Sequence, residues 1–364
     1  MSVVVLAACG PGEMRVAAVE GDTPLDYAIS RPGAPDGVGD VHAGRVIARV
    51  PAIGGAFVAL PNGEGFLPDT EGAAELTDGA SVLVRITRAA QGGKGPRLSV
   101  RVTGPPRRGP GAVERLALLH PQAPVRVDDP AMAVALRSAL GERITLVRPP
   151  AFDAALEAEI EALGEPGVAL PGGGFLSVHP TPALTAIDLD AGGAAAGRAG
   201  KGAMHRALNE AALPVLARQI RLRNLSGAIL VDWAGLSPRK RTSIGPALAA
   251  ALADDPLRPR LLGFTHLGLA EIVRTRVHPP LHELLAGPHA TGLAALRRLV
   301  AEAAADPARP RALRAASAIA TALMGDAAAR ADVARLTGRE LVLRGDASLG
   351  PGRWRVETLA YPYA

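Results

Sequence analysis

Cysteine, aromatic residues and long apolar runs are all scarce in this sequence, and each scarcity excludes a class of structure. Cys9 is the single cysteine among 364 residues, so no intrachain disulfide and no cysteine-based zinc cage can form, which favours a reducing, cytoplasmic setting. No apolar run reaches the roughly 18 residues of a membrane helix, so no membrane partner is expected. Aromatic residues make up only 3%, yet the hydrophobic fraction of 48% suffices for two or three compact domains.

The balance of charge is basic. The formal net charge is +5 and the isoelectric point is about 9.9, which suits a polyanionic partner such as a nucleic acid. A basic excess of this size is also common among soluble proteins, so charge alone does not identify the partner.

The first hundred residues predict β structure. Short apolar runs separated by Gly- and Pro-containing turns are expected to be strands at residues 3–6, 14–20, 25–30, 44–50, 55–60, 64–67, 81–87 and 97–102. Strands of this length and spacing are typical of a small barrel. Residues 103–111, rich in Pro, Gly and Arg, predict a linker.

From residue 114 to residue 277 the pattern alternates between strands and helices, as in an α/β domain. Strands are expected at 125–127, 144–147, 228–232 and 260–264, with a hairpin over 174–190. Helices are expected at 131–140, 151–163, 239–253 and 269–277, and before residue 223. The chain beyond predicts helices to about residue 336 and a terminal hairpin of 340–343 with 354–358.

Two of the apolar strands end on carboxylates. Asp188 and Asp190 lie at the end of one strand, and Asp232 at the end of another. The carboxyl ends of strands are where α/β sheets bind ligands, and carboxylate oxygens without His or Cys suit Mg²⁺, with Mn²⁺ as a substitute. Alternatively, these aspartates cap the helices that follow.

The glycine-rich segment 192–202 invites comparison with a phosphate-binding loop but lacks its pattern. Ala195 stands where the first glycine is required, and Gly202 replaces the Ser or Thr. A basic loop beside the aspartates is the better interpretation.

Aromatic and basic residues in the barrel predict a surface for single-stranded nucleic acid. Phe57 and Phe66 lie in Gly-flanked strands, and Lys94 and Arg97 lie in the turn between 92 and 97. Aromatic side chains beside a basic loop can stack bases. The alternative is that both Phe residues fill the barrel core.

Three basic clusters are expected around the acidic strand ends, where they would bind phosphates. They are the helix end with Arg221 and Arg223, the segment 239–241, and the segment with Arg274 and Arg276. An ordinary solvated surface would have the same composition.

These motifs, taken together, resemble the ribonuclease E/G family. GDVHAGRV at 39–46, GAFV at 55–58, GFL at 65–67 and GKGPRL at 93–98 resemble that family's OB-fold RNA-binding barrel. The match continues almost without a break from 172 to 276, through GGFL, ALTAID, ARQIRLRNL and LGFTHLGL.

The resemblance implies an α+β multidomain protein in which an N-terminal OB-fold barrel precedes an α/β DNase-I-like catalytic domain and a small C-terminal α+β domain. Asp188 and Asp232 would hold the metal ion, which activates water to cleave single-stranded RNA and leave 5′-phosphate products. Phe57, Phe66 and Lys94 would hold the strand. The expected boundaries are residues 1–35 for an N-terminal β segment left from the RNase-H-like portion, 36–103 for the barrel and 104–122 for a linker. The catalytic domain is expected at 123–288 and the small C-terminal domain at 289–364.

Three departures from the family pattern matter. Asp190 replaces the family's Asn, so it could join the metal site or raise a neighbour's pKa. The family's zinc-sharing Cys-Pro-x-Cys is absent, so no structural zinc is expected and any homo-oligomer would not be zinc-linked. The RNase-H-like portion with its 5′-monophosphate pocket is reduced to little more than 103–122 and the first thirty-odd residues.

Two other functions fit part of the pattern. A non-catalytic RNA-binding or ribosome-associated protein could keep this scaffold, although the aspartate pair argues against it. A metal-dependent phosphodiesterase acting on DNA or small nucleotides could share the aspartates, but not the stacking pair of the barrel.

Overall fold

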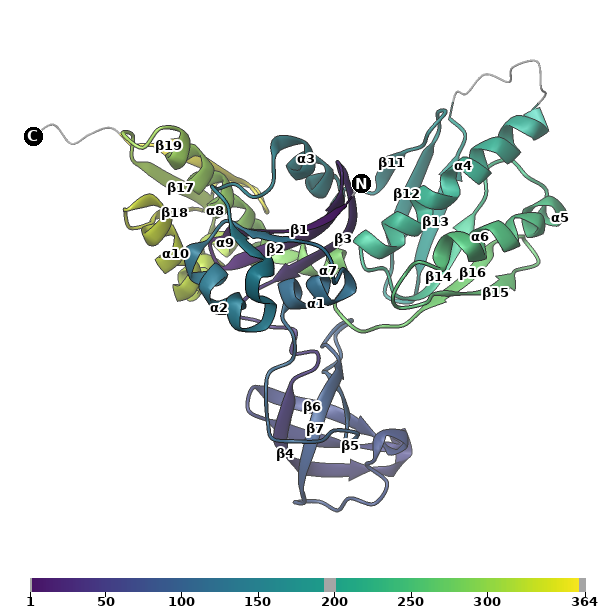
Figure 1. Cartoon of the computed structure of the whole chain (residues 1–364), viewed down its shortest axis with the longest axis horizontal. Helices are drawn as coiled ribbons and strands as arrows, with labels where there is room; N and C mark the ends of the chain where they lie inside the picture. Colours follow the sequence, from purple (N-terminus) through teal and green to yellow (C-terminus); the bar gives the residue numbers. More distant parts are fainter. Residues whose placement is uncertain (1, 193–200, 360–364) are drawn as a thin grey trace, which may run out of the picture. The chain divides into compact units, whose positions relative to one another are not determined.

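The structure, a computed structural model, describes residues 2–192 and 201–359, which form two units built from separated stretches of chain (Figure 1). The first unit combines Met1–Pro35, Gly111–Ala155 and Leu284–Ala364, and the second combines Asp36–Pro110 and Leu156–Glu283. Most of the expected glycine-rich loop, residues 193–200, lies outside the described residues.

A five-stranded mixed sheet forms the first part of unit one. Its strands are β1 (Val3–Gly10), β2 (Glu13–Glu20), β3 (Thr23–Ser30), β9 (Val125–Val127) and β10 (Ile144–Leu146), in the order β10-β9-β1-β2-β3. The first three are antiparallel neighbours, and β9 and β10 run parallel to β1. Helices α1 (Ala112–Leu119) and α2 (Pro130–Leu140) pack on this sheet through Val113, Leu116 and Leu136.

This sheet joins segments that the sequence analysis kept apart. The expected division at residue 123 does not coincide with the division between sheets, because Val125 and Val127 on β9 pair with Val5 and Ala7 on β1. The amino-terminal strands are therefore part of a complete five-stranded sheet. The strand at 125–127 was expected, but its pairing with a partner more than a hundred residues away leaves no local signal in the sequence.

The C-terminal part of unit one is a small α+β layer. It contains α8 (Gly287–Ala305), β17 (Arg311–Ala316), α9 (Ser317–Gly325), α10 (Ala327–Thr337), β18 (Val342–Asp346) and β19 (Trp354–Thr358). The predicted terminal hairpin is wrong, because β18 and β19 both pair with β17 and not with each other. The central strand RALRAA lies in a stretch predicted to be helical, since Ala, Leu and Arg are good helix formers.

Unit two begins with the predicted barrel, which is confirmed as a closed five-stranded structure. Its strands are β4 (Val41–Val50), β5 (Gly55–Leu60), β6 (Gly63–Pro68), β7 (Ser81–Arg88) and β8 (Arg97–Ser99), closed in the order β4-β5-β6-β8-β7. Its interior is filled by small and medium apolar residues, among them Ala56, Val58, Leu67, Val84 and Leu98.

The second part of unit two is a six-stranded sheet. Its strands, in spatial order, are β11 (Gly167–Ala169), β12 (Phe175–Pro180), β13 (Thr185–Asp190), β14 (Gly227–Asp232), β16 (Ala270–Arg274) and β15 (Arg260–Phe264). Helices α4 (Lys201–Leu222), α5 (Pro238–Arg241) and α6 (Gly245–Leu252) accompany it, and α3 (Ala154–Ala162) precedes β11 in the chain. The short α7 (Leu281–Leu284) follows the last strand.

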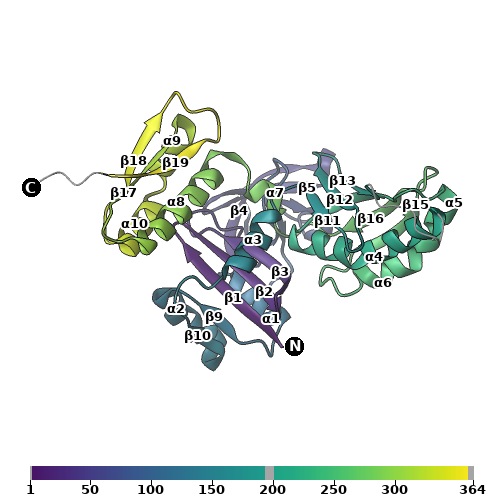
Figure 2. The ribbon, with the colours of Figure 1, turned by 90° about the horizontal axis from the view of Figure 1, so that it is seen from above.

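Only one face of this sheet forms the core. Helices α4 and α6 pack on it (Figure 2), covering alternate strand residues such as Ile187, Leu189, Ile229 and Val231. Because strand side chains alternate between faces, the residues between these, including Asp188, project from the opposite face.

The helix predicted at 269–277 is wrong. The structure has strand β16 (Ala270–Arg274) there, between β14 and β15, with buried and half-buried residues in strict alternation. No helix in the described part of the chain is long and apolar enough to span a membrane.

Candidate active site

Asp188 and Asp232 are direct neighbours across two parallel strands. Strands β13 and β14 pair in a register that sets Asp188 opposite Asp232, so both side chains project from the same face of the sheet. That face lies opposite the core, because Ile187 and Val231, which precede them, are buried in it. The two carboxylate-bearing strand ends therefore converge, as the sequence indicated.

The surroundings of Asp188 disfavour its negative charge. Its pKa is raised above the ordinary value of an aspartate, first by partial removal from water and then by repulsion from Asp232 and Asp190. His179 and Arg241 act in the opposite direction. A site with this balance of charges favours the arrival of a cation or a proton.

Arg241 partly compensates the second carboxylate. Its Nη1 donates to Oδ1 of Asp232, and its Nε donates to the carbonyl of Leu236 at 2.8 Å. The guanidinium is thus held by the backbone of the same loop and orients Asp232. Of the three expected basic clusters, the segment 239–241 is the one that lies at the acidic strand ends.

Helix α4 holds the loop that follows Asp232. Asn209, which is fully buried, donates to the carbonyl of Ala234 at 3.0 Å and accepts from its amide at 3.1 Å. His205 lies 3.2 Å from the carbonyl of Gly235 through Nδ1. Gly235 has φ +59°, and a Cβ there would lie 1.9 Å from the His205 ring, so only glycine fits.

Asn209 and His205 were missed by the sequence analysis. They lie four residues apart on α4, on a side of the helix that otherwise buries Leu208, Ala212 and Leu216. Two polar residues at helical spacing on an apolar face are a signal of buried hydrogen bonding, and this signal was available in the sequence.

Neither carboxylate of the pair caps a helix. Asp188 lies within strand β13, and the helix after β14 begins at Pro238 with Ser237 as its N-cap residue. Asp190 accepts from the amide of Gly192 at 2.9 Å, as in a local turn. The helix-capping alternative is therefore wrong.

The carboxylates offer a pair of candidate metal ligands. Within residues 2–192 and 201–359, no group of three or more His, Cys, Asp or Glu side chains is arranged to hold a metal ion. Asp188 and Asp232 therefore carry the candidate site by themselves, and Asp190, included in the expected ligand set, is not part of a three-residue cluster.

The barrel presents its two Phe residues on its outer face. Phe57 and Phe66 are partners in the β5–β6 ladder, and their ring centroids are 5.7 Å apart with an angle of 62° between the planes. Neither belongs to the barrel core, which takes the adjacent Ala56, Val58 and Leu67. The core-filling alternative for these rings is therefore wrong.

Basic residues flank this aromatic pair. Arg97 on β8 is the ladder partner of Phe66. Lys94 is exposed in a tight turn, where Gln91 and Lys94 exchange backbone hydrogen bonds of 3.0 and 3.1 Å. Phe57, Phe66 and Arg97 thus form a row across three strands.

Two of the expected RNA-binding arginines are instead structural. Arg223 is buried, with its Nε donating to Gln219 and its Nη1 to the carbonyl of Glu165. Arg274 is buried against Asp255, with its Nε 2.7 Å from the carboxylate. Both guanidiniums lie in the interior, which corrects the expectation that they contact RNA.

The remaining arginines of these clusters lie at the other end of β14. Arg274 pairs with Gly227, the first residue of that strand, and five strand steps put this end about 16 Å from Asp232. Arg276 is exposed. Burial lowers the pKa of Arg88, and repulsion from Arg97 and Arg276 lowers it further. Arg221 donates to the carbonyl of Asp254.

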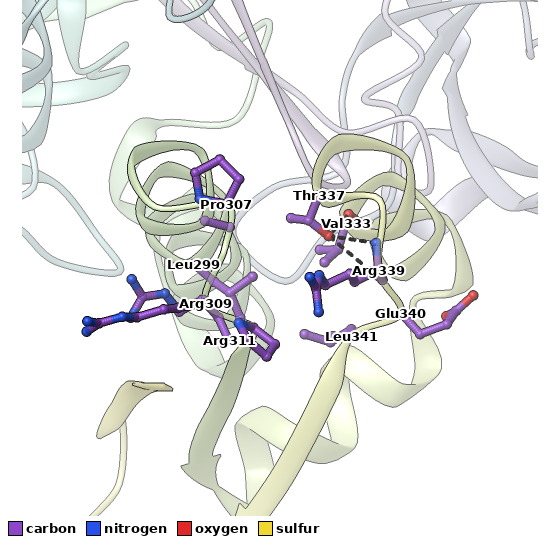
Figure 3. A pocket seen from close by; sticks show the side chains of 11 residues that line it. Leu299, Pro307, Arg309, Arg311, Val333, Thr337, Arg339, Glu340 and Leu341 are labelled. Atoms are coloured by element: carbon purple, nitrogen blue, oxygen red, sulfur yellow. Dashed lines mark hydrogen bonds between the residues drawn. The ribbon is translucent and has the colours of Figure 1, made fainter. Parts of the chain in front are cut away.

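A small pocket in the C-terminal part of unit one is lined by none of these residues. Apolar walls from Leu299, Val333 and Leu341 surround it, with arginines at its margin (Figure 3). Arg309 and Arg311 both pair with Asp306, and Arg339 and Glu340 also line the pocket.

Comparison with known proteins shows what part of this chain is similar to. Ribonuclease E of Nostoc sp. is 35% identical over 130 residues, which is 35% of this chain and 19% of that protein. Ribonuclease G of Escherichia coli K12 is 32% identical over 147 residues, covering 38% of this chain and 28% of that protein. The similar proteins are thus ribonucleases, and the alignments span only 19% and 28% of their length.

Residues 130–277 match the model of the Ribonuclease E/G family. The matched region contains Asp188, Asp232 and the α4 residues that hold the neighbouring loop, whereas the barrel lies outside it.

Proposed function

We propose that this protein is an endoribonuclease that cleaves single-stranded RNA with a divalent metal ion. The observation that carries the proposal is the in-register pair Asp188 and Asp232, within the region shared with ribonucleases E and G. In this reading the six-stranded sheet is the DNase-I-like catalytic domain, the barrel is an OB-fold, and the five-stranded sheet is the RNase-H-like portion.

The donor set fits Mg²⁺, with Mn²⁺ as a substitute. Two carboxylates on an open sheet face suit a hard cation that keeps several waters and also binds a phosphate oxygen. Without a cation this face would repel RNA, because Asp190 adds a third negative charge beside the pair. When bound, the metal supplies an activated water and neutralises charge on the phosphodiester, and hydrolysis by this water leaves a 5′-phosphate product.

The protein's own residues have separate roles in this proposal. Arg241 orients Asp232 through their ion pair, and Asn209 holds the backbone at Ala234. Phe57 and Phe66 stack bases of the single strand. Lys94, Arg97 and Arg276 contribute positive charge for the phosphates, since all three are at least partly exposed.

The direct test is incubation of the protein with 5′-labelled single-stranded RNA and Mg²⁺. We expect endonucleolytic cleavage that is lost on chelation and reduced on the order of 10²–10³-fold in Asp188→Asn, as for loss of an electrostatic catalytic group. RNA binding and thermal stability of Asp188→Asn should be retained. Asp22→Asn, a change at an exposed turn of unit one, is the matched control.

Other outcomes would point elsewhere. Binding of RNA without cleavage under any divalent metal would favour a non-catalytic RNA-binding protein. Equal cleavage of DNA and RNA oligonucleotides in competition would favour a general phosphodiesterase.

A further inference from the structure

Phe175 is an exposed aromatic side chain on the same sheet face as the aspartate pair. It is 57% exposed, although the chain has only five Phe residues. Its neighbours in β12 alternate as expected, with Leu176 and Val178 buried in the core below. Phe175 therefore projects from the face opposite the helices.

The strand register sets this ring beside the carboxylates. Phe175 is the ladder partner of Asp190, and Ser177 is the ladder partner of Asp188. Directly opposite side chains have Cβ atoms about 5 Å apart and diagonal ones about 7–8 Å. Asp188 is a diagonal neighbour of Phe175, and Asp232 lies one strand further on. This spacing is within the reach of one nucleotide from its base to its phosphodiester.

The backbone that carries the ring is closely packed. Gly174 has φ +85°, and a Cβ there would lie 2.5 Å from the carbonyl oxygen of Asp190. The carbonyl of Gly174 also accepts from the amide of Leu170 at 3.1 Å. Phe175 is thus presented by a strand end that is fixed against β13, and the position of its Cβ relative to Asp188 is set by the sheet.

We propose that Phe175 stacks the nucleobase next to the scissile phosphodiester and so positions that bond at Asp188 and Asp232. The inference rests on the proposed function. An aromatic face accepts any base and reads no hydrogen-bonding edge, so Phe175 selects for the presence of a base and not for its identity. The barrel pair Phe57 and Phe66 sets affinity for the strand, whereas Phe175 sets which bond is cut.

The test compares Phe175→Ala and Phe175→Trp on a single-stranded RNA with one main cleavage site. A second RNA carries an abasic nucleotide next to that site. We expect Phe175→Ala to lower kcat about tenfold, as for loss of one base-stacking contact, with cleavage spread over neighbouring bonds and KM little changed. Phe175→Trp should restore the rate and the pattern.

The abasic RNA separates stacking from an indirect effect. Wild-type protein should lose a similar factor on this RNA, and Phe175→Ala should lose nothing more, since the contact is already absent. The proposal would be overturned if Phe175→Ala lost a further factor in rate on the abasic RNA, or if it had wild-type kinetics on the intact RNA. Leu262→Ala, a change at a similarly exposed apolar residue on the edge strand β15, is the matched control.

A readout without cleavage keeps this test distinct from that of the proposed function. In an Asp188→Asn background, 2-aminopurine is moved one position at a time along the RNA, and its fluorescence is quenched where it stacks. At least one quenched position should recover its fluorescence when Phe175→Ala is added. If no position depends on Phe175, the proposal is wrong, whether or not the wild-type protein cleaves RNA.

Discussion

Asn209 on α4 and Ala234 on the loop after β14 are joined by two buried hydrogen bonds, one in each direction. The amide side chain therefore fixes the backbone two residues after Asp232. The position of this candidate metal ligand thus depends on α4, which packs on the opposite face of the sheet.

Replacing Asn209 should affect both stability and the site. In Asn209→Ala the amide and carbonyl of Ala234 lose their partners in the interior, where each unsatisfied group costs about 1–3 kcal/mol. We expect a lower free energy of unfolding in urea, and a loss of cleavage under conditions where the variant is still fully folded. Glu210→Ala, on the exposed side of the same helix, should change stability by less than about 0.5 kcal/mol. Equal behaviour of the two variants would contradict this role.

The pKa of Asp188 should respond to its neighbour Asp190. Repulsion from Asp190 is one cause of the raised pKa, so Asp190→Asn should lower it towards the ordinary value of 3.8. Carboxyl carbon NMR titration of the metal-free protein measures the shift. An unchanged pKa of Asp188 in Asp190→Asn would show that the carboxylate of Asp190 is turned away.

The same shift predicts a sign for stability against pH. Because the pKa of Asp188 is higher in the folded state, the folded protein binds this proton more tightly than the unfolded chain. The contribution of Asp188 to stability is therefore present at low pH and is lost as pH rises from 3.8 through the raised value. Asp188→Asn should accordingly be at least as stable as the wild type at neutral pH, and this advantage should disappear in acid.

The aromatic pair of the barrel should contribute to binding and little to folding. Phe57→Ala or Phe66→Ala removes a stacking surface worth about 1–3 kcal/mol per base, so affinity for single-stranded RNA should fall roughly tenfold to hundredfold. Thermal stability should change little, because neither ring belongs to the barrel core. Unfolding together with lost binding would contradict this separation.

Two neighbouring arginines on and after β16 should behave in opposite ways. Arg274→Ala leaves the buried carboxylate of Asp255 without its partner, which should destabilise the protein by about 3–5 kcal/mol. Arg276→Ala, at an exposed position, should leave the unfolding curve unchanged and weaken RNA binding in a salt-dependent way. Urea unfolding and binding at two salt concentrations separate the two effects.

The 5′ end of the substrate should have little influence on the rate. Within the five-stranded sheet, the connection from β3 to β9 contains only the barrel and α1, and that from β9 to β10 contains only α2 and one short turn of helix. This leaves no further folded segment there to grip a terminal phosphate. Initial rates on 5′-monophosphate, 5′-triphosphate and 5′-hydroxyl versions of one RNA should agree. A preference of about tenfold or more for the monophosphate would reveal a selective phosphate site.

Much of the architecture followed from local patterns. The barrel strands, the strand ends with Asp188 and Asp232, and the surface pair Phe57 and Phe66 were expected from alternation, turn residues and resemblance, and the structure has them. The wrong predictions concern segments whose secondary structure depends on strands that pair with them. Residues 270–274 form a strand because β14 and β15 lie on either side, and β17 is a strand because β18 and β19 flank it.

By itself the sequence determined which residues form strand ends, turns and apolar faces, because those properties depend on neighbours a few positions away. Only the tertiary structure decided that Arg223 and Arg274 are buried at the far end of β14, that Asn209 holds Ala234, and that β9 completes the amino-terminal sheet. An arginine beside a buried carboxylate and one facing solvent have the same local sequence signal. Their difference arises from contacts between segments far apart in the chain, which only folding brings together.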